Sequence, residues 1–251
     1  MSDKPEFYVG YLAMPPRLKW IIRGLIVVLL GLVALDAWLI AQLQQQPGDG
    51  RWAETPQEFV GTLTRAPYPT LRTIENGAPR TYIVISDEKR GAEPMLEGIE
   101  DGASVKIQGY LIERAAVGMI QLAATGNDVA KTDAPPVADA DREIHGAVTI
   151  EGEIVDSKCW LGVMRPGDGH IHKACASLCI RGGIPPMFVS RGGDAPPVML
   201  MTLPDGRAIP PDDILDHVAD RVSLTGIIEK RGDVTVFKVD LASLKRTHSG
   251  H

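Results

Sequence analysis

The feature that most constrains this 251-residue chain is a long apolar stretch near its N-terminus. Residues 25–35 contain no charged or strongly polar side chain, and the apolar run continues past Asp36 to Ile40. A helix that spans a bilayer needs about 20 apolar residues. The stretch therefore predicts one transmembrane helix over residues 20–43, which separates a short N-terminal tail from the rest of the chain.

The distribution of basic residues predicts the orientation of this helix. Four basic residues lie between positions 4 and 23, and the next one is Arg51. The positive-inside rule then places residues 1–19 in the cytoplasm and the chain after the helix in the periplasm, on the inner membrane of a bacterium. The alternatives are a cleaved signal peptide and a buried core helix. We favour an uncleaved anchor because residues 35–41 offer no good small-x-small cleavage site.

The remainder of the chain is predicted to be mainly β. Short β-branched or alternating runs, punctuated by Gly, Pro and Asn, are typical of strands. They cover residues 59–64, 81–86, 104–113 and 119–123, and then 143–155, 198–202, 221–229 and 234–239. A stretch without periodicity lies between the two sets. We therefore expect a first domain over 52–126, a linker over 127–141 and a second domain over 142–247.

The two predicted domains resemble each other. Residues 105–109 (Val-Lys-Ile-Gln-Gly) match residues 222–226 (Val-Ser-Leu-Thr-Gly) in spacing, and Gly61 in the first domain echoes Gly152 in the second. A glycine in a strand allows the bend that closes a small barrel. The pattern favours two five-stranded OB-like barrels that arose by duplication, with two unrelated β domains as the alternative.

The repeat shows that the second domain carries an insertion. Gly61 and Gly109 are 48 residues apart, whereas Gly152 and Gly226 are 74 residues apart. The extra length is close to the span from Cys159 to Met187, within the insertion 156–187, which holds all three cysteines of the chain, while the first domain contains no cysteine and no histidine. We expect a site grafted onto the second barrel and a scaffold or docking role for the first.

A short helix is predicted inside the insertion. Asp168 is a suitable N-cap, and Gly182 is suitable as the residue that follows the last turn, so a helix is expected over residues 170–181. Three potential ligands then lie at positions i, i+3 and i+7 on one face of the helix, and Cys159 can fold back onto that face from the preceding strand.

These residue types predict a metal site, with Zn²⁺ as the favoured ion. Three thiolates and one imidazole form the tetrahedral ligand set of structural zinc, and they also suit copper or an iron–sulfur cluster. The predicted ligands are Cys159, His172, Cys175 and Cys179, with His170 and Met187 as further candidates.

A second interpretation needs no metal. An exported chain meets oxidising conditions, so Cys159 can pair with Cys175 or Cys179 and leave the third thiol free. A disulfide between Cys175 and Cys179 within one helix would be strained, and therefore labile and redox-active. The odd number of cysteines argues against a purely structural disulfide.

The insertion and the strands around it resemble a known group of proteins. The order is Gly-Glu-Ile-Val-Asp-x-x-Cys, a Pro-Gly turn, His-x-x-Cys-Ala-x-x-Cys-Ile and a Gly-x-Pro-Pro turn. This order is similar to that of uncharacterised small exported bacterial proteins with an OB-like domain, over about residues 145–240. The resemblance implies an OB-like fold and the ligand set Cys159, His172, Cys175 and Cys179, and it implies no reaction.

These features predict a membrane-anchored periplasmic metal-binding protein, an accessory or electron-transfer subunit of a membrane redox complex. The expected partner is an integral membrane protein, onto which the apolar tail residues 6–16 are suited to dock. The alternatives are a thiol-disulfide or copper-delivery protein and a structural zinc module for protein–protein binding. The chain has no recognisable nucleophile–base pair, phosphate loop or paired carboxylates, so a non-catalytic role is expected. The net charge of −6 and the dispersed basic residues exclude a nucleic-acid partner.

Overall fold

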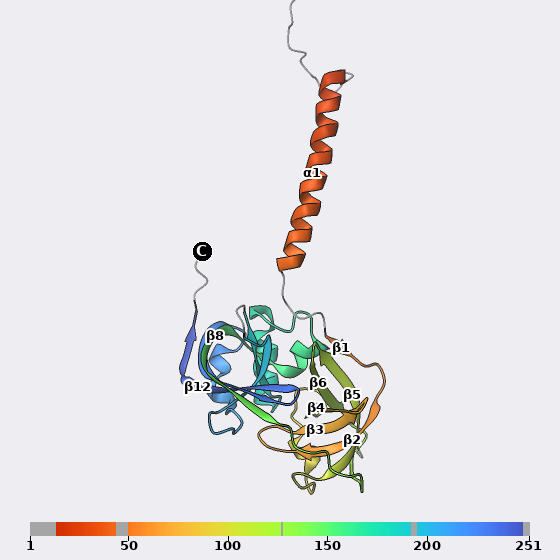
Figure 1. Ribbon diagram of the computed structural model, residues 1–251, viewed down its shortest axis with the longest axis vertical. Helices are drawn as coiled ribbons and strands as arrows, with labels where there is room; N and C mark the ends of the chain where they lie inside the picture. Colours follow the sequence, from red (N-terminus) through yellow and green to blue (C-terminus); the bar gives the residue numbers. More distant parts are fainter. Residues whose placement is uncertain (1–13, 44–49, 127, 192–194, 248–251) are drawn as a thin grey trace, which may run out of the picture. The chain divides into compact units, whose positions relative to one another are not determined.

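The computed structural model describes residues 14–43, 50–126, 128–191 and 195–247. Residues 1–46 and 47–251 form two separate units, which are described in turn. The first unit contains helix α1 (Pro16–Leu43), the helix at the red end of the chain in Figure 1. It is long and apolar enough to serve as a membrane anchor or a signal sequence. The helix begins four residues before the predicted boundary at residue 20, and residues 1–13 of the predicted tail lie outside the described part of the chain.

The first β domain is a closed five-stranded barrel (Figure 1). Strand β5 pairs with both β2 and β6, and a parallel pairing of β4 with β6 completes the closure. Two short strands, β1 and β7, add to the edge of β5. The bounds are β1 Arg51–Trp52, β2 Gln57–Thr64, β3 Thr70–Glu75, β4 Ala78–Ile85, β5 Ser104–Arg114, β6 Val117–Leu122 and β7 Val129–Lys131, with a 3₁₀ turn η1 at Glu93–Leu96.

The second β domain is also a closed five-stranded barrel, in the order β10-β12-β11-β8-β9. Its parallel pair is β10 with β12, and its other pairs are antiparallel. The bounds are β8 Arg142–Asp156, β9 Pro186–Ser190, β10 Val198–Thr202, β11 Arg221–Arg231 and β12 Val234–Arg246, with 3₁₀ turns η4 at Pro211–Asp213 and η5 at Leu215–His217.

The two barrels share their topology and their register. In each, the third and fifth strands are the parallel pair, as expected for an OB-like Greek key. Gly61 lies opposite Val105, and Gly152 lies opposite Val222. A Cβ atom at Gly61 or Gly152 would lie 2.2 or 2.3 Å from a carbonyl oxygen of the neighbouring strand, so only glycine permits this close approach. The prediction of two OB-like barrels is confirmed.

The barrels pack against each other through a shared apolar cluster. Each barrel has its own core, but a third cluster combines side chains of both. Tyr68 and Ile83 of the first barrel and Trp160 and Met187 of the second belong to it. The Arg114 guanidinium of β5 lies 4.3 Å above the Trp160 ring and donates to the Trp160 carbonyl oxygen (3.0 Å). The insertion of the second barrel therefore lies at the junction of the two barrels.

Several strands differ from the predicted pattern. The sequence runs did not include β1, β3, β7 and β9. In β3 the buried face holds Leu71 and the polar Thr73 while Ile74 is exposed, and β9 begins with Pro186, a residue allowed only at a strand start or edge. Strand β7 lies in the segment predicted as a linker, where it pairs with β5.

Candidate metal centre

The insertion between β8 and β9 folds as two short turns and a helix. Strand β8 ends at Asp156, the chain then forms a single π-helical turn η2 (Cys159–Val163), and a 3₁₀ turn η3 (His170–His172) leads into helix α2 (Lys173–Arg181). The predicted helix over 170–181 is thus present, with a 3₁₀ first turn. The equivalent connection in the first barrel, between β2 and β3, is only residues 65–69.

The predicted caps of this helix are different in the structure. Asp168 makes no cap hydrogen bond, because its carboxylate accepts from the Arg191 guanidinium (3.0 Å). At the other end Gly183, rather than Gly182, has the left-handed conformation (φ 96°). Gly182 is needed for another reason. A Cβ atom there would lie 1.8 Å from the Lys89 carbonyl oxygen of the first barrel.

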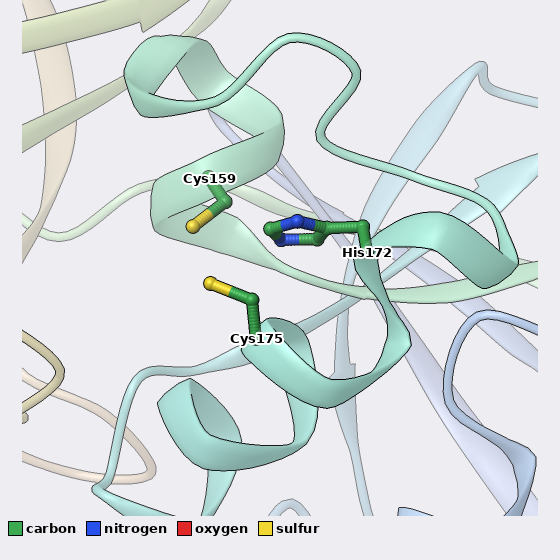
Figure 2. A group of neighbouring side chains, drawn as sticks. All are labelled: Cys159, His172 and Cys175. Atoms are coloured by element: carbon green, nitrogen blue, oxygen red, sulfur yellow. The ribbon is translucent and has the colours of Figure 1, made fainter.

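Three thiols and one imidazole converge at the junction of these elements. The ligand atoms of Cys159, His172 and Cys175 lie within 4.8 Å of one another, and those of Asp156, Cys159 and Cys179 do so as well. The side chains of Cys159, His172 and Cys175 point into one common space (Figure 2). A tetrahedral ion with Zn–S bonds of about 2.3 Å holds its sulfur ligands roughly 3.8 Å apart. The cluster is compatible with one metal ion of the zinc type.

Asp156 contacts two members of the cluster, Cys159 and His172. Its side chain is fully buried; Oδ1 accepts a hydrogen bond from the Cys159 N–H (2.9 Å), and Oδ2 lies 3.0 Å from His172 Nε2. A buried carboxylate requires such partners. When Nε2–H donates to Asp156, Nδ1 keeps the lone pair that a metal requires, which is the usual carboxylate–histidine–metal arrangement.

The first barrel contributes a lysine to this centre. Lys89 Nζ donates to Cys175 Sγ (2.7 Å) and lies 3.6 Å from Cys179 Sγ. The hydrogen bond to Cys175 raises the pKa of Lys89 from 10.5 to about 12. A zinc ion with three thiolates has a net charge of −1, which the Lys89 ammonium balances. The site is therefore built from both barrels.

The turn that carries Lys89 is fixed against the insertion. The Gly91 N–H donates to the Gly182 carbonyl oxygen at the end of α2 (2.9 Å), and Lys158 Nζ donates to the Glu88 carbonyl oxygen (2.5 Å). Lys158 is itself buried, and this burial lowers its pKa. Contacts on both sides of Lys89 thus hold its ammonium group at the sulfur atoms.

The thiols differ in their environments. The Cys159 thiol donates to the Cys179 sulfur, and this contact raises the pKa of Cys159 and lowers the pKa of Cys179. Both side chains are buried, whereas Cys175 is partly exposed, and all three are free thiols in this structure. The three cysteines border an open pocket of about 500 Å³ that is also lined by Trp52 and Gln121 of the first barrel.

The two further ligand candidates differ in their positions. His170 is largely exposed, and its Nδ1 lies 3.4 Å from the Asp220 carboxylate. His170 therefore does not join the cluster. Met187 is buried on β9, in the same apolar cluster as Cys159 and Cys179.

Three residues around the centre, Asp156, Lys158 and Lys89, were not among the predicted ligands. Asp156 and Lys158 flank Cys159 in the sequence, where they are compatible either with tuning its thiolate or with a solvated ion pair. In the structure both side chains are buried. Lys89 lies in a charged turn, Asp-Glu-Lys-Arg-Gly, with no sequence signal of its role. Only the packing of one barrel on the other brings it to the cysteines.

Comparison of the chain with protein-family models, with curated proteins and with solved structures found no match in any of the three. The candidate site is therefore assessed on its geometry and its chemistry.

Proposed function

We propose that this chain is a membrane-anchored, periplasm-facing metalloprotein that holds one metal ion between its two barrels. The proposed ligands are Cys159, His172, Cys175 and Cys179. The observation that carries the proposal is the convergence of three thiols and an imidazole on one space, with Asp156 behind the imidazole and Lys89 beside the thiols. A cluster built only for packing does not need a buried carboxylate and an ammonium group.

Zn²⁺ is the ion that these ligands favour most. Its borderline-soft character suits mixed sulfur and nitrogen ligands, and it imposes no further geometric preference. Copper is the second choice, because the same thiolates bind Cu(I). An iron–sulfur cluster is third, since it prefers four cysteines.

We further propose an accessory or electron-transfer role in a membrane redox complex, with an integral membrane protein as the partner. Two observations support this role over that of a sealed structural zinc module. The thiols border an open pocket, and Cys175 is partly exposed. The apolar helix α1 suits a chain that works at a membrane.

The test is elemental analysis of the full chain, purified in detergent without chelators or a metal-affinity column. We expect about one metal ion per chain in the unmodified protein and almost none in Cys175→Ser or His172→Gln. His145→Gln is the matched control, because His145 is exposed on β8 outside the cluster. A metal-free protein with three titratable thiols would contradict the proposal.

A second candidate is a thiol-disulfide or copper-delivery protein. The specific observation in its favour is that the Lys89 ammonium lies at the sulfur atoms of both Cys175 and Cys179, and that Cys175 is partly exposed. This role predicts rapid alkylation of Cys175 in the purified protein. A metal centre predicts that alkylation becomes fast only after chelation.

A further inference from the structure

A second pocket lies at the barrel junction and shares no lining residue with the pocket of the metal centre. Its volume is about 120 Å³. Its walls come from β3 and β4 of the first barrel, from the end of the segment that joins the barrels, and from β10 and the β11–β12 hairpin of the second. The apolar part of the lining includes Pro67, Tyr68, Leu200, Val234 and Val236.

Three arginines line this small pocket: Arg72, Arg142 and Arg231. Arg231 Nε is paired with the buried Glu229 (2.5 Å), which also holds Lys238 (2.5 Å). Within the described part of the chain, no carboxylate oxygen lies within 4.0 Å of the guanidinium of Arg72 or Arg142. The charges of these two arginines are not neutralised by an ion pair.

One donor of the Arg72 guanidinium has no partner within the described part of the chain. Its Nη1 donates to Thr81 Oγ1 (3.2 Å), but its Nε is buried and has no hydrogen-bond partner among the described residues. A buried donor without a partner is costly and rare in native proteins. The Arg72 guanidinium is therefore only partly satisfied by the described residues.

The charge balance of the lining favours an anion. Asp139 is the one carboxylate among the described lining residues, and it is exposed. Three guanidinium groups beside an apolar floor match the usual pattern of a small-molecule site, which is mostly apolar with a few fixed polar groups. Guanidinium groups recognise carboxylates by paired, charge-assisted hydrogen bonds.

We propose that this pocket binds a small organic anion with one carboxylate and a short apolar body. The carboxylate lies against Arg72, Arg142 and Arg231, and the apolar body lies on Tyr68, Leu200 and Val236. A cavity of about 150 Å³ accommodates benzene, so a ligand of benzoate size is near the upper limit for this pocket. The proposal does not depend on the metal centre. Because both barrels line the pocket, the bound anion also stabilises their junction.

The test is isothermal titration of the full chain in detergent with benzoate and butyrate, each compared with its neutral amide, and with inorganic phosphate. We expect saturable binding of one carboxylate per chain, with no binding of the amides. Equal binding of an amide would show that the pocket is only an apolar cavity and would overturn the proposal. Binding of phosphate without carboxylate would also overturn it, as would binding of none of these probes.

Variants then locate the binding. Arg72→Gln and the more exposed Arg142→Gln should each weaken carboxylate binding at least about tenfold, because each removes a charge-assisted hydrogen bond. Arg221→Gln is the control, since Arg221 is an exposed arginine outside the pocket. Arg142 serves as the second probe if Arg72→Gln does not fold. Unchanged affinity in a folded variant at either position would contradict the assignment.

Discussion

The two barrels have one topology and one register, yet only the second carries a metal-ligand set. They differ in the connection between the first and second strands, which is residues 65–69 in one barrel and residues 157–185 in the other. The glycines that close the barrels are equivalent, so the scaffold is the same. The same barrel scaffold can therefore carry a candidate site on one of its connections or have none there.

In each barrel, the connection between the first and second strands nevertheless contacts the other barrel. The short one buries Tyr68, whose hydroxyl oxygen accepts a hydrogen bond from the Ile209 N–H of the second barrel (3.1 Å). The long one receives Lys89 from the first barrel. Each barrel therefore contributes a side chain to the other, and residues of both barrels form the candidate metal centre.

The equivalence of the barrels is tested most strongly at Gly61 and Gly152. Alanine at either position places a Cβ atom against a backbone carbonyl oxygen, so each variant should lose about 3 kcal/mol of unfolding free energy. Urea unfolding followed by circular dichroism measures the loss. Gly146→Ala is the control, because a Cβ atom there meets nothing within 4 Å. If only one of the two variants is destabilised, the barrels are not equivalent.

The second largest effect, on metal affinity, is expected at Asp156. This residue ends β8, and the connection that distinguishes the two barrels begins after it. Asp156→Asn removes the charge that orients His172 and should weaken metal affinity about 10- to 100-fold. Competition with a chromophoric chelator measures the affinity. Asp212→Asn, at an exposed acidic position, should have no effect. An unchanged affinity in Asp156→Asn would mean that His172 is not a ligand.

A smaller effect is expected from the first barrel's contribution to the centre. Lys89→Met should weaken metal affinity about tenfold, because the thiolates lose a charge-assisted hydrogen bond. The raised pKa of Lys89, about 12, means that its stabilising contribution is present below its ordinary value of 10.5 and is lost as the pH rises through 12. The deficit should therefore be the same at about pH 6 and pH 8.

Lys131→Met on the exposed strand β7 is the matched control for Lys89→Met. Equal affinities of the two variants would show that the second barrel alone builds the site.

The smallest effect on stability is expected at Tyr68, which lies on the short connection of residues 65–69. Tyr68→Phe leaves the Ile209 N–H without its partner and should cost about 1 kcal/mol of unfolding free energy. Tyr110→Phe, whose hydroxyl has no comparable contact among the described residues, should be neutral. Burial raises the pKa of Tyr68 to about 12, so stability should fall as the pH rises above 10 toward that value. A normal titration of every tyrosine would contradict the buried contact.

Much of the fold could be predicted from periodicity and spacing. The alternating runs located most of the strands, and the glycine spacing located the repeat and its insertion, because barrel closure requires the same close approaches in each copy. Strands such as β3 and β9 were missed, because β3 buries the polar Thr73 and exposes Ile74, and β9 begins with a proline.

The candidate site was predictable only in its local part. Helical spacing placed His172, Cys175 and Cys179 on one face, because that spacing is fixed by the turn of the helix. The roles of Asp156 and Lys89 depend on burial and on packing between the barrels, which local sequence does not encode. His170 has the same residue type as His172 but faces Asp220, and only the direction of the 3₁₀ turn distinguishes them.

The most direct test of the central claim is X-ray absorption spectroscopy of the full chain loaded with zinc in detergent. We expect one zinc ion with three sulfur neighbours at about 2.3 Å and one nitrogen at about 2.0–2.1 Å. The His145→Gln variant should give the same spectrum, whereas His172→Gln should retain too little zinc to give it. A first shell of oxygen atoms, or one with fewer than two sulfurs, would contradict a metal centre at the cysteines.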